Sequence, residues 1–184
     1  MNCALLIIDF QAGLVDSAPL PGDAAAVATN INTLSTRARQ AAVPVIFIQH
    51  ENEDALRHGS TAWQLSAGLQ VEPGDYRIGK RTPDSFLRTE LQTVLAEHDV
   101  KHVVVCGYAT EFCVDTTVRR AAANGYGVTI AADAHTTHDK PHADAARIRE
   151  HHNATLSNIR SFGPKIAAVS TDAIDFRSLA RPRC

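Results

Sequence analysis

The sequence has few of the features that mark special classes of protein. Its four cysteines form no Cys-x-x-Cys pair, so the chain predicts neither a disulfide framework nor a zinc finger. Lys and Arg total 18 against 20 Asp and Glu, and a net charge of −2 lacks the basic excess that duplex binding usually needs. The apolar stretch 41–48 contains a proline and is far too short to cross a bilayer. Nucleic acids and membranes are therefore not expected as partners.

What remains is the composition of an ordinary folded chain, with 45% apolar and 21% charged residues. No internal repeat, low-complexity tract or linker divides the sequence, so one domain is expected over residues 1–184. The start, Met1-Asn2-Cys3, passes directly into an apolar run and lacks the basic region of a secretory signal. Together with the scattered cysteines, this start favours a cytoplasmic protein with reduced thiols.

Strand-like and helix-like segments alternate along the whole chain. Short apolar runs predict strands at 4–8, 43–48, 76–78, 103–106, 128–132 and 166–169. Apolar residues at three- and four-residue spacing predict helices at 24–42 with Asp23 as N-cap, 85–98, 111–124, 142–157 and 171–179, with a shorter one around 61–65. This alternation is typical of an α/β fold in which helices cover both faces of a parallel sheet.

Three chemically capable residues stand at the exits of predicted strands. Asp9 follows the first strand, Lys80 follows 76–78, and Cys113 lies on the first turn of the helix after 103–106. Taken singly, Asp9 could be a helix cap, a metal ligand or a phosphoacceptor, Lys80 a solvated lysine, and Cys113 a small buried side chain. Because ligands bind at the carboxyl ends of parallel strands, we expect all three to converge there. A carboxylate, an ammonium and a thiol would then supply a proton shuttle, an electrostatic clamp and a nucleophile.

The setting of Cys113 strengthens its candidacy as a nucleophile. Gly107 permits a tight turn from the strand into the helix. Free N–H groups and the positive dipole at a helix N-terminus are expected to lower the pKa of the thiol and to stabilise a developing oxyanion.

Four segments carry a family resemblance in the expected order: LLIIDFQ at 5–11, GK at 79–80 followed by Phe86, VVCGYATEFCV at 104–114, and AADAH at 131–135. With these, the sequence resembles the isochorismatase-like cysteine hydrolases, which include nicotinamidases, carbamoylsarcosine amidohydrolases and ureidoacrylate amidohydrolases. The resemblance implies a three-layer α/β/α fold with a six-stranded, mostly parallel sheet. It implies an Asp9–Lys80–Cys113 triad, a cis peptide between Tyr108 and Ala109, and an oxyanion hole made by the N–H groups of Ala109 and Cys113.

The resemblance also implies a reaction. The expected activity is hydrolysis of a small amide, ureido or carbamoyl C–N bond through a thioester on Cys113, with no cofactor. A small-molecule substrate and a homodimer or larger homo-oligomer are the expected partners. Residues that could contact the substrate are Phe10, Gln11, Trp63, Tyr108 and His135. Trp63 could instead be a core or subunit-contact residue, and His138 could line the pocket with His135 after a strand exit.

The match weakens at the metal site of the nicotinamidase branch, which carries an Asp-x-His pair after the second strand and another histidine beyond. Here His50, Asp54 and His58 could ligate a metal only if a helix set them at four-residue spacing, and no metal is expected. His151 and His152 lie near a helix end, where a charge or cap explains them adequately.

Three other functions stay open. Isochorismatase itself cleaves a vinyl ether, but that branch lacks the nucleophilic cysteine present here as Cys113. A catalytically silent binding protein on the same scaffold would be free to lose one of the three residues. In a redox protein, Cys113 would be a peroxide-sensitive thiol with Cys106 as a spatial neighbour, whereas Cys3 and Cys184 suggest no site.

Overall fold

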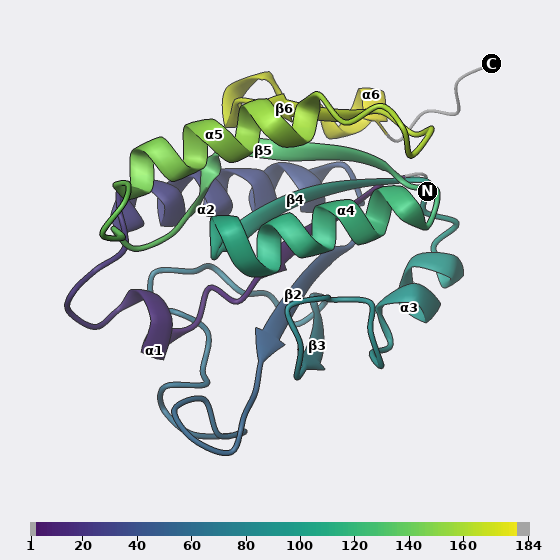
Figure 1. Ribbon diagram of the computed structural model, residues 1–184. Helices are drawn as coiled ribbons and strands as arrows, with labels where there is room; N and C mark the ends of the chain where they lie inside the picture. The colour runs from purple at the N-terminus through teal and green to yellow at the C-terminus, as the bar shows by residue number, and fades with distance from the viewer. Residues whose placement is uncertain (1–2, 180–184) are drawn as a thin grey trace.

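The computed structural model describes residues 3–179, which form one six-stranded sheet (Figure 1). The strands are β1 (Cys3–Ile8), β2 (Val45–His50), β3 (Tyr76–Lys80), β4 (His102–Tyr108), β5 (Gly127–Thr136) and β6 (Ile166–Val169). They lie in the order β3-β2-β1-β4-β5-β6, and every neighbouring pair is parallel. The predicted sheet is therefore confirmed.

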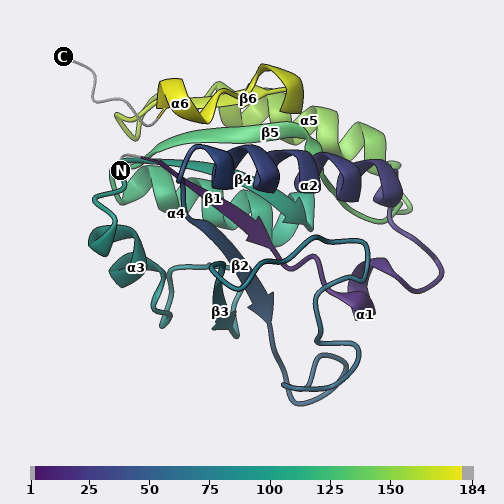
Figure 2. The same cartoon turned by 180° about the vertical axis from the view of Figure 1, so that it is seen from behind.

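Helices cover both faces of this sheet and complete three layers. The helices are α1 (Ala12–Val15), α2 (Ala24–Gln40), α3 (Leu91–Glu97), α4 (Asp115–Ala123), α5 (Ala145–Ser157) and α6 (Phe176–Leu179), with a π-helical turn η1 (Thr110–Val114) and a 3-10 turn η2 (Thr171–Ala173). Side chains of α3, α4 and α5 join the core on one face, and those of α2 and α6 join the core on the other. Figure 2 shows α2 in front of the sheet when the molecule is seen from behind.

The central strand β1 is apolar throughout because both of its faces are covered. All six residues of β1 are buried, and alternate residues enter opposite cores: Leu6 and Ile8 on one side, Leu5 and Ile7 on the other. Within residues 3–179, no helix combines the length and apolar character that a membrane span requires.

The predicted helix at 85–98 is wrong in its first half, because α3 begins only at Leu91. Polar side chains hold the preceding turns in another conformation. Asp84 accepts a hydrogen bond from the N–H of Phe86 and pairs with Arg120, while the Ser85 hydroxyl bonds to that of Thr117. Such local side-chain bonds compete with helix formation.

The short helix expected around 61–65 is also absent, because these residues form turns that lead to a single bridge between Gln11 and Leu65. The helix predicted at 111–124 is real but begins as the π-helical turn η1. The segment 171–179 divides into η2 and α6. Asp23 holds the N-cap position of α2, but its side chain bonds to Arg149 instead of capping the helix.

The strand predicted at 128–132 extends as β5 to Thr136, with an irregularity in its pairing to β4 between Val105 and Gly107. From the sequence we expected His135 to follow the exit of this strand. It lies inside β5 instead. Gly107 lies where β4 meets β1 and has a φ of +117°; a Cβ there would stand 2.1 Å from the carbonyl oxygen of Ile8. Only glycine fits this crossing.

Candidate active site

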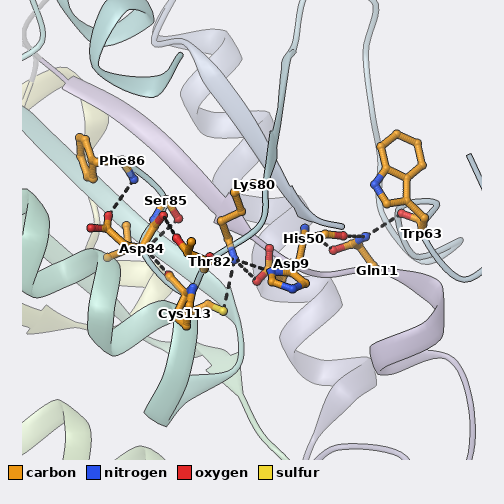
Figure 3. A network of polar contacts seen from close by, with 12 residues as sticks. Asp9, Gln11, His50, Trp63, Lys80, Thr82, Asp84, Ser85, Phe86 and Cys113 are labelled. Atoms are coloured by element: carbon orange, nitrogen blue, oxygen red, sulfur yellow. Dashed lines mark hydrogen bonds and ion pairs between the residues drawn. The ribbon is translucent and has the colours of Figure 1, made fainter. Parts of the chain in front are cut away.

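Asp9, Lys80 and Cys113 meet at the carboxyl edge of the sheet, although they come from three separate strand exits (Figure 3). The Nζ of Lys80 lies 2.6 Å from the Oδ2 of Asp9 and 3.3 Å from the Sγ of Cys113. Lys80 is only 2% exposed and Asp9 1%. In a site this dry, the ion pair is held by its mutual attraction and by hydrogen bonds.

The ammonium of Lys80 has two further neighbours. Its Nζ lies 3.1 Å from the carbonyl oxygen of Thr82 and 3.4 Å from the Nδ1 of His50. His50 and Lys80 end neighbouring strands and are partners in the register of β2 with β3. The lysine is therefore surrounded by acceptors from four parts of the chain, and its side chain has one well-defined position.

Asp9 occupies a strained backbone conformation at the end of β1. Its φ is +46°, a left-handed value that few residues other than glycine adopt, and such strain is concentrated at functional sites. Its N–H is bonded to the carbonyl oxygen of Ile48. The second carboxylate oxygen, Oδ1, is buried and has no hydrogen-bond partner within residues 3–179. Asp9 thus keeps one acceptor available beside Lys80.

Cys113 differs from the sequence-based expectation in its acidity. Burial raises the pKa of its thiol to about 12, and the carboxylate of Asp9 adds to this effect, while Lys80 opposes it. The expected lowering of the pKa by a helix N-terminus was therefore wrong. At neutral pH the sulfur is therefore protonated as a thiol. A base must take its proton when it attacks a substrate, and Asp9 is the carboxylate beside it.

The backbone before Cys113 has the form that the resemblance implied. The peptide bond between Tyr108 and Ala109 is cis. Ala109 has extended backbone angles and occupies the N-cap position of η1, whose fourth residue is Cys113. The first N–H groups of a helical turn lack intrahelical partners, which makes such a position suitable for binding an oxyanion.

Two of the residues expected to contact a substrate have structural surroundings instead. Phe10 is 1% exposed and packs in the core that contains α2. Gln11 is fully buried, and its side-chain amide is occupied: Nε2 donates to the carbonyl oxygens of His50 and Trp63, and Oε1 accepts from the N–H of His50. Gln11 therefore fastens the loop after β2 to the start of α1.

Trp63 lies on that loop, with its ring against His58 at a centroid distance of 4.3 Å. Its carbonyl oxygen also accepts a hydrogen bond from Gln49, and its ring Nε1 is buried with no partner within the described chain. In Figure 3 the tryptophan stands apart from Lys80 and Cys113.

Tyr108 and His138 are joined at the side of the site. The hydroxyl of Tyr108 lies 2.8 Å from the Nδ1 of His138, whose Nε2 lies 2.9 Å from the carbonyl oxygen of Pro19. Burial, followed by the nearby Glu111 carboxylate, raises the pKa of Tyr108 to about 12. The phenol is therefore neutral and near the charges of the site.

His135 is fully buried and both ring nitrogens have protein neighbours. Nδ1 lies 2.9 Å from the hydroxyl of Thr110, the first residue of η1, and Nε2 lies 2.9 Å from the Oδ1 of Asn153. Burial lowers the pKa of His135 to about 4, so the ring is neutral. Its position connects α5 to the turn that carries Cys113.

The three possible metal ligands do not assemble. His50 faces Lys80, the Nδ1 of His58 lies 2.9 Å from a carboxylate oxygen of Glu51, and the N–H of Asp54 bonds to Asn52. No group of three or more His, Cys, Asp or Glu side chains between residues 3 and 179 is arranged to hold a metal ion. Cys184 lies outside the described residues.

Sequence reasoning missed the contact between His50 and Lys80 and the chain from Thr110 through His135 to Asn153. The contact between His50 and Lys80 could have been predicted, because His50 ends a predicted strand and the exits of parallel strands converge. The second could not, because it depends on how far β5 extends and on where α5 crosses it.

Comparisons with known proteins agree with the observed fold. The family model for the isochorismatase domain matches residues 3–171. A streptothricin hydrolase of Streptomyces noursei is 32% identical over 142 residues, which are 76% of this chain and 56% of that protein. Nicotinamidase 3 of Arabidopsis thaliana is 31% identical over 176 residues, 87% of this chain and 81% of its own. A crystal structure of an isochorismatase family protein has a TM-score of 0.84 at 37% identity and covers 92% of this chain and 98% of its own. This chain spans only about half the length of the streptothricin hydrolases it matches.

Proposed function

This chain belongs to the isochorismatase family, and from that premise we propose that it is a cysteine hydrolase that cleaves a C–N bond of a small amide, ureido or carbamoyl compound. The observation that carries the proposal is the position of the buried Lys80 ammonium, 2.6 Å from the Asp9 carboxylate and 3.3 Å from the Cys113 sulfur. Nicotinamidase and streptothricin hydrolase among the relatives support hydrolysis of this class.

The first half of the reaction transfers the acyl group to the enzyme. Asp9 takes the proton of the Cys113 thiol while the sulfur attacks the substrate carbonyl carbon. The carbonyl π electrons move onto oxygen, and the N–H groups of Ala109 and Cys113 stabilise that oxyanion. As the C–N bond breaks, the protonated Asp9 returns its proton to the leaving nitrogen, so that ammonia or an amine departs and a thioester remains.

The second half restores the enzyme with water as the only co-substrate. Asp9 takes a proton from water while the oxygen attacks the thioester carbonyl, and the C–S bond then breaks. The sulfur recovers the proton from Asp9, and the acid product leaves. Lys80 stabilises the negative charge that passes between Asp9 and the sulfur. No step requires a metal or an organic cofactor.

The raised pKa of Cys113 supports these roles of Cys113 as nucleophile and Asp9 as base. A thiol with a pKa of about 12 is almost wholly protonated at neutral pH, so the adjacent carboxylate must act as the base. The orphaned Oδ1 of Asp9 supplies an acceptor for that proton.

The redox alternative has less support. Cys106 is fully buried, burial raises its pKa, and its Sγ lies 3.5 Å from the carbonyl oxygen of Leu6. It belongs to the core on one face of the sheet, while Cys113 packs against the core on the other face. A disulfide between them would require the strand to reorganise.

Ammonia release from a panel of small amides, ureido acids and N-carbamoyl compounds tests the proposal. Cys113→Ala is expected to lower turnover of the best compound at least about 10³-fold, because it removes the nucleophile. Cys3→Ala, a thiol loss in β1 away from the site, is the matched control and should retain activity. Treatment with a chelator should leave turnover unchanged. Full activity of Cys113→Ala would overturn the proposal.

A further inference from the structure

Lys80 has more acceptors around it than protons to give. An ammonium carries three N–H donors, yet four acceptors lie within 3.4 Å of Nζ. The Asp9 carboxylate and the Thr82 carbonyl are the two nearest, at 2.6 and 3.1 Å. The third proton is left for either the sulfur of Cys113 at 3.3 Å or the Nδ1 of His50 at 3.4 Å. While the sulfur is a neutral thiol, it is the weaker acceptor, so the proton goes to His50.

This hydrogen bond decides the tautomer of His50. A neutral imidazole that accepts at Nδ1 carries its proton on Nε2. The ring is half-buried, and none of the residues 3–179 accepts a hydrogen bond from Nε2. Figure 3 shows the ring beside Asp9 and Lys80, at the same strand edge as Cys113. The active-site edge therefore presents one fixed N–H donor that no protein group uses.

We propose that His50 is a substrate-contacting residue, held by Lys80 as a neutral Nε2–H donor for a second hydrogen-bond acceptor on the substrate. The inference rests on the proposed hydrolase function and narrows its substrate class. The oxygen of the attacked carbonyl is served by the N–H groups of Ala109 and Cys113, so His50 addresses a different atom. Ureido and N-carbamoyl compounds with an additional carbonyl or carboxylate fit this description, and simple monofunctional amides do not.

The charges around His50 agree with a neutral donor. Burial and the ammonium of Lys80 lower its pKa, and Asp9 and Glu51 only partly offset them. The Glu51 carboxylate is engaged by His58 at 2.9 Å and by Arg81 at 3.1 Å. A proton added to Nδ1 would face the lysine ammonium directly. The ring is therefore kept in the form that accepts from Lys80 and donates from Nε2.

The two amide substitutions separate the donor from the acceptor. His50→Asn can keep an acceptor near the position of Nδ1 for Lys80 but has no group at the position of Nε2. His50→Gln extends one bond further and can return an N–H to that position. Alkylation of Cys113 by iodoacetamide reports on the Lys80 site without any substrate, and its rate should change less than about threefold in His50→Asn.

The test pairs each compound of the panel with an analogue in which methyl replaces the second acceptor, as N-ethylurea replaces N-carbamoylglycine. For the best compound, His50→Asn should lower kcat/KM about 10- to 100-fold, while turnover of its methyl analogue should change less than about threefold. His50→Gln should restore part of the loss.

Equal losses on both compounds, or no loss on either, would overturn the role of His50. A merely structural role would give equal losses together with slower alkylation of Cys113. If wild type shows no Cys113-dependent turnover of any compound, the proposed function fails first and the role of His50 fails with it. These results differ, so the two failures are distinguishable.

Discussion

At the scale of single residues, the buried ion pair of Lys80 limits which substitutions in the site report on catalysis alone. It is buried beside an equally buried Asp9, so removing either charge leaves the other without a partner. Breaking such a pair costs about 3–5 kcal/mol in stability. Loss of activity in a Lys80 or Asp9 variant would therefore mix unfolding with chemistry. Variants of Cys113 and His50 remove no charge from the pair and report on catalysis more directly.

A second residue, His135, links stability to pH. Its pKa is about 4 in the folded protein, against 6.5 for an ordinary histidine, because burial disfavours the charged ring. Below pH 6.5 the His135 ring is protonated in the unfolded chain, whereas in the folded chain it stays neutral down to about pH 4. The free energy of unfolding therefore falls as the pH falls. Integrated down to pH 4, this one group removes about 3 kcal/mol from the free energy of unfolding.

Urea unfolding between pH 7.5 and 4 measures this loss. His135→Gln removes the titrating group and is expected to have a lower free energy of unfolding at pH 7.5, but to lose less of it on acidification. Since His50 also has a lowered pKa and acts in the same direction, the comparison is between the two pH slopes. Identical slopes in the wild type and His135→Gln would contradict the assignment.

At the scale of elements, the loop between β2 and β3 depends on a clamp from the start of α1. Gln11 makes three hydrogen bonds to His50 and Trp63 from a fully buried position. Gln11→Met keeps a similar volume and removes these bonds. We expect amide hydrogen exchange over residues 51–66 to accelerate at least about 10-fold, since each unsatisfied buried group costs about 1–3 kcal/mol.

The matched control is Asn32→Ala, which removes hydrogen bonds from α2 to Gly68 and Gln70 at the other end of the same loop. Its effect should stay near residues 68–70. Unchanged exchange over 51–66 in Gln11→Met would show that the loop holds itself without the clamp.

Elements differ in how well the sequence predicts them. The strands β1, β2 and β4 are predictable because burial on both faces favours runs of apolar residues. The exits of β1 and β4, together with the end of β3, bring Asp9, Cys113 and Lys80 to one edge. The turns at 81–90 are not, because Phe86, Leu87 and Leu91 have helical spacing while Asp84 and Ser85 hold a different backbone through tertiary contacts. Hydrophobic periodicity in the sequence indicates which side chains are buried, and it carries no information about such tertiary contacts.

The same limit applies to the site. From the sequence, Gln11 is a polar residue close to a strand exit, where a residue that contacts the substrate is expected. Its amide is nevertheless taken up by the backbone of a loop some 40–50 residues away, which only the fold reveals. The pKa of Cys113 was mispredicted for a related reason, because burial of the sulfur and the neighbouring Asp9 carboxylate raise it, and both depend on the fold.

At the scale of the whole molecule, the sheet separates Cys113 from the buried thiol of Cys106 and brings four strand exits to one edge. β2, β1, β4 and β3 contribute His50, Asp9, the turn to Cys113, and Lys80. Assembly as a homodimer or larger, and a cytoplasmic location, remain predictions from the sequence.

Direct detection of the thioester on Cys113 tests the central claim. Wild-type protein mixed with the best compound of the panel is quenched in acid and its peptides are analysed by mass spectrometry. We expect the acyl mass on the peptide that carries Cys113, its removal by hydroxylamine, and its absence in Cys113→Ala. Rapid turnover with no acyl group on Cys113, under conditions where the quench preserves a synthetic thioester, would contradict the account.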